Sequence, residues 1–295
     1  MAGTFNTYDM MKGIAERGLR SQKRNPQDRV GPDGLLICGH CGEPRQEFIK
    51  LPDPIPGAPN RVRKLKVAVM CRCDREAEEK ERKKEEGKKN LERIKALRNS
   101  SLMVGIAKTW TFEKDDGQHN AENLRRCRNY AKKFDSMIER NQGLLLYGSE
   151  GTGKSFAAAC IANYLLDRMV PVIMTSTVKL ISQIQSGSYE EEQLIQRMSG
   201  VKLLVLDDFG AERRNEYAAE RVYNIIDSRY RQQLPMILTT NLNLNDMKAE
   251  TDMTYRRIYD RIFEVCYPLQ FAGPSRRKEQ ANKKYRETEK LLNDD

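Results

Sequence analysis

From about residue 101 onward, short apolar or β-branched runs alternate with amphipathic segments long enough to form helices. Short buried strands that alternate with helices are typical of an α/β fold with a parallel sheet. We therefore predict a five-stranded parallel sheet flanked by helices, with one more helix over Gln280–Leu292. The five predicted strands are Gly143–Tyr147, Pro171–Thr175, Val201–Leu206, Pro235–Thr240 and Val265–Gln270.

The first 73 residues follow a different pattern. Apolar residues recur near a helical period early in the chain, which predicts one amphipathic helix. Two strand-like runs, Gln46–Leu51 and Lys64–Met70, flank the proline-rich loop 51–57 and predict a hairpin. The helix has two possible roles, binding a partner or packing within this module. Its apolar positions are Tyr8, Met11, Ile14 and Leu19.

A highly charged segment joins the two regions. Nearly every residue from Asp74 to Arg98 is charged, and many opposite charges stand four residues apart, such as Glu79 and Lys83. These pairs favour a solvated single helix, and its nearly balanced charge favours a linker over a DNA-binding element. Its last turns offer an apolar face made by Leu91, Ile94 and Leu97. The predicted domains are an N-terminal module (1–73), a helical linker (74–98) and an α/β domain (99–295).

Charge is unevenly distributed along the 295 residues, which carry a net charge of +10. Residues 1–73 hold 13 basic and 7 acidic side chains, and this excess suits a polyanion such as nucleic acid. The apolar runs are too short for a membrane span, and residues 1–20 lack the apolar core of an export signal. Together with an odd number of cysteines, seven, this predicts a reducing, cytoplasmic location without a membrane partner.

The clearest chemical motif lies directly after the first predicted strand. It matches G-x-x-x-x-G-K-[ST] at every fixed position and leads into a predicted helix. Its glycines let successive N–H groups face phosphates, and the helix N-terminus adds partial positive charge. Lys154 is expected to reach the β- and γ-phosphates of ATP, and the Ser155 hydroxyl to help hold Mg²⁺. The motif is Gly148, Ser149, Glu150, Gly151, Thr152, Gly153, Lys154 and Ser155.

Two further strand ends carry polar side chains. The run Leu203–Leu206 ends in Asp207 and Asp208, which places two carboxylates at the edge of the sheet that carries the phosphate loop. Asp207 fits the acid that organises Mg²⁺, and Asp208 fits the group that polarises the attacking water. The next run ends at Asn241, whose amide is placed to hydrogen-bond the γ-phosphate or the water.

Four cysteines form two close pairs in the N-terminal module. Cys38 and Cys41 have the Cys-x₂-Cys spacing of a zinc knuckle, and Cys71 and Cys73 form a tighter pair that we expect at a strand end. Four thiolates complete a closed tetrahedral site, so the predicted Zn²⁺ is structural. His40 is a possible substitute ligand, although its position next to Cys41 makes that geometry awkward.

The order of these motifs, followed by Asp260-Arg261, resembles the AAA+ ATPases that load bacterial replicative helicases. These are the DnaC and DnaI type, related to the IstB transposition ATPases. The resemblance covers roughly residues 100–280. It implies an AAA+ P-loop αβα sandwich that binds ATP and Mg²⁺, and it agrees with the cysteine cluster because some loaders carry a zinc-bearing N-terminal domain.

The resemblance also implies roles for basic residues. In such proteins the arginine of an Asp-Arg pair reaches the nucleotide of a neighbouring subunit, which makes Arg261 the finger candidate, with Arg256 and Arg257 as competitors. A Ser-x-Arg near the C-terminus senses nucleotide in the same subunit, which makes Arg277 the candidate, with Arg276 as the alternative. Positions expected to lie near single-stranded DNA are Lys179, Arg213 and Arg214.

The predicted function is ATP-dependent helicase loading. ATP-bound copies would self-associate on single-stranded DNA while the N-terminal module binds the replicative helicase, and ATP hydrolysis to ADP and phosphate would release it. One alternative is an IstB-like transposition ATPase that binds DNA and recruits a transposase. Another is a zinc-dependent nucleic-acid-binding adaptor with a structural ATP site, against which the intact Lys154, Asp207 and Asp208 argue.

Overall fold

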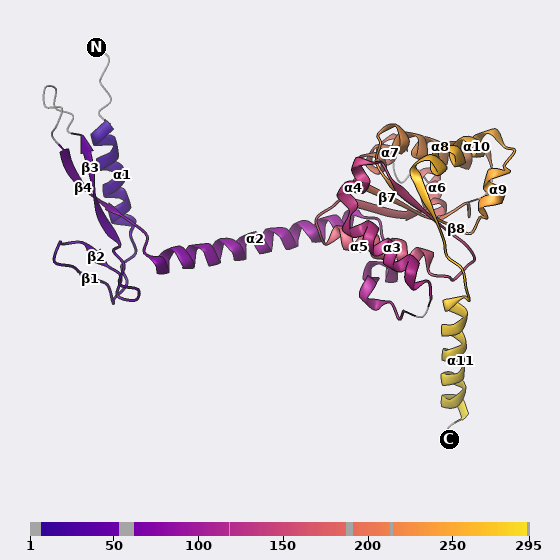
Figure 1. The fold of residues 1–295 in the computed structure, drawn as a ribbon, viewed down its shortest axis with the longest axis horizontal. Helices are drawn as coiled ribbons and strands as arrows, with labels where there is room; N and C mark the ends of the chain where they lie inside the picture. Colours follow the sequence, from indigo (N-terminus) through magenta and orange to yellow (C-terminus); the bar gives the residue numbers. More distant parts are fainter. Residues whose placement is uncertain (1–6, 53–61, 118, 187–190, 213–214, 294–295) are drawn as a thin grey trace, which may run out of the picture. The chain divides into compact units, whose positions relative to one another are not determined.

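The computed structural model of the chain describes residues 7–52, 62–117, 119–186, 191–212 and 215–293 (Figure 1). The chain forms two compact units, Met1–Lys89 and Asn90–Asp295. Most of the proline-rich loop 51–57 lies outside the described residues. None of the described helices combines the length and the apolar character that crossing a membrane requires.

The first unit contains one helix and two small antiparallel sheets. Helix α1 (Thr7–Ser21) packs against the hairpin of β3 (Gln46–Pro52) and β4 (Val62–Ala68), so the predicted helix and hairpin are confirmed. Strands β1 (Arg29–Val30) and β2 (Leu36–Ile37) form the other sheet.

The packed face of α1 differs from the predicted one at a single position. Ile14 is 51% exposed, whereas its neighbour Ala15 is buried. The turn of the helix places the small Ala15 side chain toward the unit, and Ile14 therefore points to solvent beside the exposed Met10.

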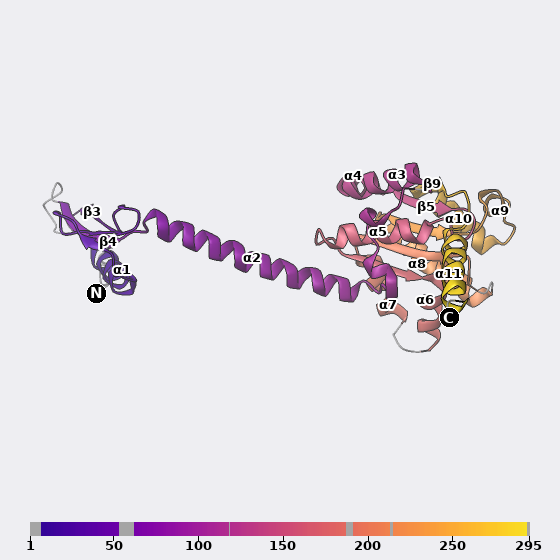
Figure 2. The ribbon, with the colours of Figure 1, turned by 90° about the horizontal axis from the view of Figure 1, so that it is seen from below.

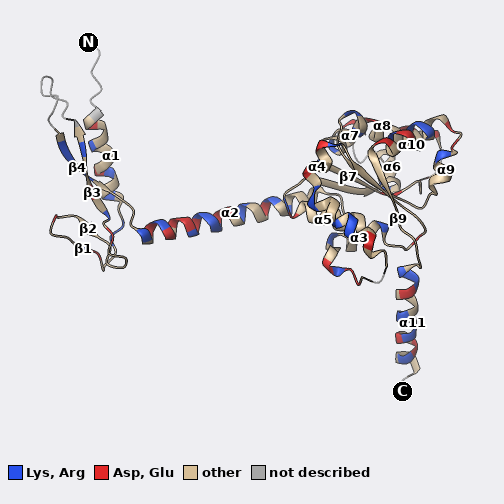
Figure 3. Ribbon diagram, viewed as in Figure 1, with Lys and Arg blue, Asp and Glu red and all other residues tan. Residues whose placement is uncertain are grey.

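The charged segment forms one helix, α2 (Arg72–Ser100), which is slightly longer than predicted and has no buried residue. Figure 3 shows its alternation of basic and acidic residues, which includes the i,i+4 ion pair of Lys83 with Glu79 at 2.6 Å. Of its predicted apolar face, Leu97 packs against the core of the second unit, while Leu91 is 52% exposed. The boundary between the two units lies inside this helix.

The second unit is a five-stranded parallel sheet between helices, as predicted. Its strands stand in the order β6-β7-β8-β5-β9, and every neighbouring pair is parallel. The elements are η1 (Gly105–Thr109), η2 (Phe112–Lys114), α3 (Ala121–Lys132), α4 (Phe134–Glu139), β5 (Gly143–Tyr147), α5 (Lys154–Leu166), β6 (Val172–Ser176), α6 (Thr177–Gln185), α7 (Glu191–Gly200), β7 (Leu203–Phe209), α8 (Glu216–Arg231), β8 (Met236–Thr240), α9 (Leu244–Lys248), α10 (Met253–Val265), β9 (Cys266–Gln270) and α11 (Arg276–Asn293).

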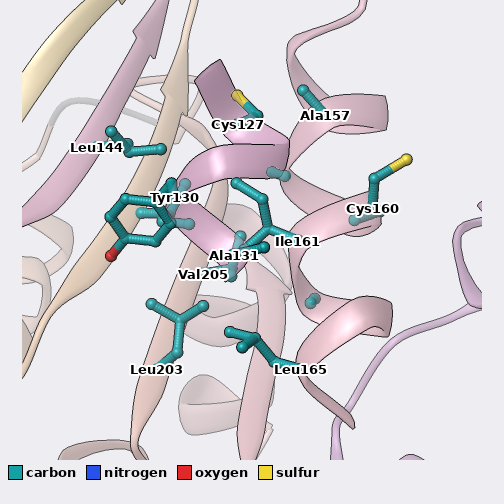
Figure 4. Close-up of a cluster of buried hydrophobic side chains, with 14 of the residues drawn as sticks. Cys127, Tyr130, Ala131, Leu144, Ala157, Cys160, Ile161, Leu165, Leu203 and Val205 are labelled. Carbon is teal, nitrogen blue, oxygen red and sulfur yellow. The ribbon is translucent and has the colours of Figure 1, made fainter. Parts of the chain in front are cut away.

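The strands are apolar on both faces because helices cover both faces (Figure 2). In β7, Leu203 and Val205 pack toward α3, α4 and α5, whereas Leu204 and Leu206 pack toward α6, α7, α8 and α10. Figure 4 shows the first of these cores, where side chains of α3 and α5 meet those of β5 and β7. The carboxyl ends of the parallel strands therefore share one edge, and the chemical motifs lie there.

Candidate nucleotide site and cysteine cluster

The phosphate-loop motif joins β5 to α5, as the sequence predicted. Its glycines adopt backbone angles that favour glycine, with φ of 137° at Gly148 and 76° at Gly151. A Cβ atom would stand 2.1 Å from the Phe271 carbonyl oxygen at the first position and 2.0 Å from Ser275 Oγ at the second. The loop can therefore wrap closely only with glycine at both positions.

Lys154 opens helix α5 and is buried. Its ammonium group donates hydrogen bonds to the carbonyls of Gly148 and Ser149, at 2.8 and 2.7 Å. Burial lowers the pKa of Lys154, and the nearby charge of Asp208 opposes that shift. The loop thus holds a positive charge among its own backbone groups, at the N-terminus of a helix where anions bind.

The two acidic residues lie within β7 rather than after it. The strand runs on to Phe209, but its pairing with β8 is irregular between Leu206 and Phe209, and Asp208 has a φ of 51°. This bulge re-aims the side chains of the two aspartates at the strand end. Thr239 fixes them: its hydroxyl donates to Asp207 Oδ1 at 2.6 Å and accepts from the Asp208 N–H at 2.9 Å.

Asp208 is electrostatically strained. Burial raises its pKa above the ordinary value, and the neighbouring Asp207 carboxylate raises it further. The positive charges of Arg277 and Lys154 act in the opposite direction. The site therefore places an acidic pair and two cations close enough for their charges to interact.

A cavity of about 620 Å³ gathers most of the predicted nucleotide-site residues. Its polar and charged lining surrounds the start of α5, and the volume is in the range of small-ligand sites. Ser155 and the nearby Asp207 offer only oxygen atoms, the ligand type that Mg²⁺ prefers. The predicted residues that line the cavity are Glu150, Gly151, Gly153, Lys154, Ser155, Asp208, Asn241 and Arg277.

The arginine candidates lie in different surroundings. Arg261 is held within its own subunit: it pairs with Asp227 at 2.5 Å and donates to the Tyr223 hydroxyl at 3.0 Å. Arg256 and Arg257 are exposed on the same helix, α10. Near the cavity, Arg276 forms ion pairs with Asp115 and Asp116, and the neighbouring Arg277 is exposed.

The positions expected near DNA are only partly described. Lys179 is exposed in the first turn of α6. Arg213 and Arg214 lie outside the described residues.

The four cysteines of the first unit converge, with their sulfur atoms within 4.8 Å of one another. A tetrahedral zinc–thiolate site separates its sulfurs by about 3.8 Å, so this donor set fits Zn²⁺. The second pair lies at the start of α2, beyond the end of β4, and not at a strand end as expected, because the chain enters the helix at Arg72. His40 is exposed and stands outside the cluster. The cluster comprises Cys38, Cys41, Cys71 and Cys73.

Backbone groups favour a thiolate at this cluster. Hydrogen bonds from the backbone of Glu43 and Cys73 lower the pKa of the Cys41 thiol to about 6. Burial instead raises the pKa of Cys71 to about 12 and of Cys73 to about 11. A metal cation would supply the positive charge that lets all four thiols ionise together.

The family model of IstB-like ATP-binding proteins matches residues 74–284 of this chain. This chain belongs to that family. The match covers the whole second unit except its last residues, so this IstB-like protein carries the family's ATP-binding region complete with its phosphate loop.

Curated relatives of this IstB-like protein are replicative helicase loaders. It is 32% identical over 151 residues to DnaC of Escherichia coli K12, which covers 50% of this chain and 58% of that protein. It is 27% identical over 151 residues to DnaI of Bacillus subtilis strain 168, which covers 47% of this chain and 48% of that protein. The aligned region thus spans about half the length of the relatives.

Solved structures share the fold of the second unit. A crystal structure of DnaI aligns with a TM-score of 0.52 and 24% identity, over 59% of this chain and 94% of that one. A putative primosome component from Streptococcus pyogenes serotype M3 aligns with a TM-score of 0.51 and 20% identity, over 61% and 97%. The AAA+ P-loop fold implied by the resemblance is confirmed.

The structure adds cavity residues that sequence reasoning left unassigned. Much of one wall comes from the segment before α3, whose only signal in the sequence was its aromatic and charged composition. Thr239 belonged to the Thr-Thr-Asn motif, but its bonds to both aspartates appear only once β7 and β8 pair. The added lining residues are Ile106, Thr109, Trp110, Lys114, Asp116, Phe156, Ala211, Arg276 and Gln280.

Proposed function

We propose that this IstB-like protein is an ATP-dependent loader of a replicative helicase. It binds the helicase through its N-terminal module and deposits it on single-stranded DNA, with ATP binding and hydrolysis as the switch. The single observation that carries the nucleotide part is the convergence of Lys154, Asp208 and Asn241 on one cavity at the phosphate loop. The loading part is supported by the similarity to DnaC and DnaI.

The residues at the cavity fit hydrolysis of the terminal phosphate. Lys154 and the loop N–H groups bind and orient the triphosphate, and Ser155 with Asp207 would hold Mg²⁺. The bound cation supplies charge neutralisation across the phosphates. Asp208 accepts a hydrogen bond from the attacking water, and Asn241 holds the water or the γ-phosphate in line.

Arg261 is the proposed finger that acts on a neighbouring subunit. Within its own chain it contacts Asp227 and Tyr223, so it would have to exchange these contacts for the neighbour's phosphate. Self-association of ATP-bound copies follows from this role, because the finger completes a site that belongs to another copy.

The N-terminal module offers an apolar stripe for the helicase. Met10 and Ile14 are 57% and 51% exposed and stand one turn apart on α1. Two apolar side chains at i and i+4 form one face, which is how an amphipathic helix docks into a partner. The structural zinc proposed at the cysteine cluster would hold the unit that presents this helix.

A pull-down of the replicative helicase with Mg²⁺ and ATP tests the proposal. The wild-type chain should capture the helicase, and the Met10→Ser/Ile14→Ser variant should lose at least tenfold in capture. Val30→Ser is the matched control, because Val30 is 70% exposed in the same unit but lies off α1. Failure of the wild-type chain to capture the helicase would overturn the loading function.

The family match favours one alternative, a transposition ATPase that binds DNA and recruits a transposase. It shares the whole nucleotide site, so only the partner separates the two functions. Preference for duplex over single-stranded DNA, measured at one salt concentration, together with no helicase capture, would favour it.

A further inference from the structure

Two segments far apart in the sequence are joined beside the nucleotide cavity. One precedes and begins α3, and the other runs from the end of β9 into α11. Four side-chain contacts connect them over more than 140 residues of chain. They are Asn123 to the Gln270 carbonyl at 2.7 Å, Asn120 to the Ala272 carbonyl at 2.9 Å, Asp115 to Arg276 at 2.9 Å and His119 to Glu279 at 2.9 Å.

Arg276 is the most enclosed cation of this junction. Its guanidinium pairs with both Asp115 and Asp116, and the side chains of Arg276 and Asp115 are 15% and 14% exposed. It also lies over the Phe156 ring, 5.8 Å from the centroid. A guanidinium that binds two carboxylates and an aromatic face is held in one orientation.

The junction also touches the phosphate loop itself. The Arg276 N–H donates to the Gly151 carbonyl at 3.0 Å, and Asn120 donates to the Thr152 carbonyl at 3.2 Å. The first turn of α11 is thereby fixed against the loop that would bind phosphate.

Consecutive residues on a helix point about 100° apart, so Arg276 and Arg277 cannot both face the acidic pair. Arg277 lines the cavity, and its charge acts on both Lys154 and Asp208. These two residues flank the place expected for the terminal phosphate. The two adjacent arginines therefore have different surroundings and different tasks.

We propose that Asp115 and Asp116 are positioning residues for ATP: they hold Arg276 and so aim Arg277 at the terminal phosphate. Neither aspartate contacts the reacting atoms, and both act through the first turn of α11. The inference rests on the proposed binding of ATP at this cavity, and it explains why the Ser-Arg-Arg sequence carries two arginines.

ATP and ADP binding to the full-length protein provide the test. Trp110 is the only tryptophan of the chain and lines the cavity, so its fluorescence can follow titration with Mg²⁺ nucleotide, with equilibrium dialysis as a second measure. Asp115→Asn/Asp116→Asn keeps the side-chain size and removes both charges. We expect its Kd for ATP to rise roughly tenfold and its Kd for ADP to change less than about twofold, because the lost contact belongs to the terminal phosphate.

A double-mutant cycle separates positioning from simple stabilisation. Arg277→Gln alone should cause the same loss, and adding it to the Asp115/Asp116 variant should cause no further loss. Glu122→Gln is the matched control: it removes a carboxylate that pairs with Arg125 and Arg126 on the exposed side of α3, and it should bind ATP normally.

Three results would overturn the inference. They are unchanged ATP binding by the Asp115/Asp116 variant, losses that add to that of Arg277→Gln, and equal losses for ATP and ADP. Absence of ATP binding by the wild-type protein would instead overturn the nucleotide function itself, so the two failures are distinguishable.

Discussion

Asp208 combines several unfavourable features in one residue. It has a left-handed backbone conformation that non-glycine residues seldom adopt, and it lies at a bulge in β7. Burial and the adjacent Asp207 carboxylate both raise its pKa. Such strain is common where a side chain must face a ligand, and the proposed role beside the attacking water accounts for it here.

We predict that Asp208→Asn stabilises the folded protein while it abolishes hydrolysis. The amide removes a charge that folding disfavours, and asparagine tolerates the left-handed conformation. Melting by circular dichroism should show a rise in Tm of about 1–3 °C at pH 7, and the ATP hydrolysis rate should fall by at least about a hundredfold.

The pH dependence of that gain follows from the direction of the pKa shift. A carboxyl with a raised pKa in the folded state costs stability above that pKa, where it is charged, and costs nothing below the ordinary value of 3.8, where both states are protonated. The gain in Tm should thus be full at pH 7 and should disappear as the pH falls toward 3.8. Asp246→Asn, on the exposed surface of α9, serves as the control; an equal gain there would contradict the explanation.

At the scale of elements, one buried arginine holds several ends of helices and strands together. Arg229 of α8 is fully buried, and it donates to the carbonyls of Ser199, Val201 and Pro235 at 3.0, 2.5 and 2.5 Å. These carbonyls belong to the end of α7 and to the residues just before β7 and β8. Burial lowers the pKa of Arg229 to about 10, so the side chain remains charged at neutral pH.

Arg229→Met should be strongly destabilising. It leaves several buried carbonyls without a donor, which costs about 3 kcal/mol or more, and the Tm of the second unit should fall by roughly 10 °C. Arg229→Lys should fall between the two, because an ammonium cannot replace the planar fork of a guanidinium. Arg231→Met, at a side chain 74% exposed on the same helix, should change the Tm by less than about 1 °C; a comparable loss there would argue against this explanation.

For the whole molecule, the two units are stabilised by different means. The second has two large apolar cores, one on each face of the sheet. Among the described residues of the first unit, the buried apolar side chains other than cysteine are only Ala15 and Leu36. A unit with so little buried apolar surface needs another source of stability, and a structural metal is the usual one.

Removal of zinc should therefore unfold the first unit and leave ATP binding intact. A zinc-selective chelator that spares Mg²⁺ should release one zinc ion per chain, reduce the far-UV circular dichroism signal of the first unit and leave the Kd for ATP within about twofold. Cys41→Ser should give the same result, whereas His40→Ala should retain zinc because His40 stands outside the cluster. Loss of ATP binding on chelation, or retention of structure, would contradict this account.

The sequence by itself determined the parts of this protein that depend on neighbouring residues. Apolar runs and helical periods located all five strands and the charged helix α2, because burial on both faces or full exposure leaves a continuous pattern. The phosphate loop was readable for the same reason: strand, glycine-rich loop and helix follow one another in the chain. The spacing of Cys38 and Cys41 likewise indicated a metal site.

Only the tertiary structure decided contacts between distant positions. The order β6-β7-β8-β5-β9, the bonds of Thr239 to the two aspartates and the pairing of Asp115 with Arg276 leave no periodic signal in the sequence. The tertiary structure also distinguished Arg276 from Arg277, which are chemically identical neighbours in sequence. Local patterns arise from the helix and strand repeats, whereas each long-range contact depends on packing of elements that the chain brings together only when it folds.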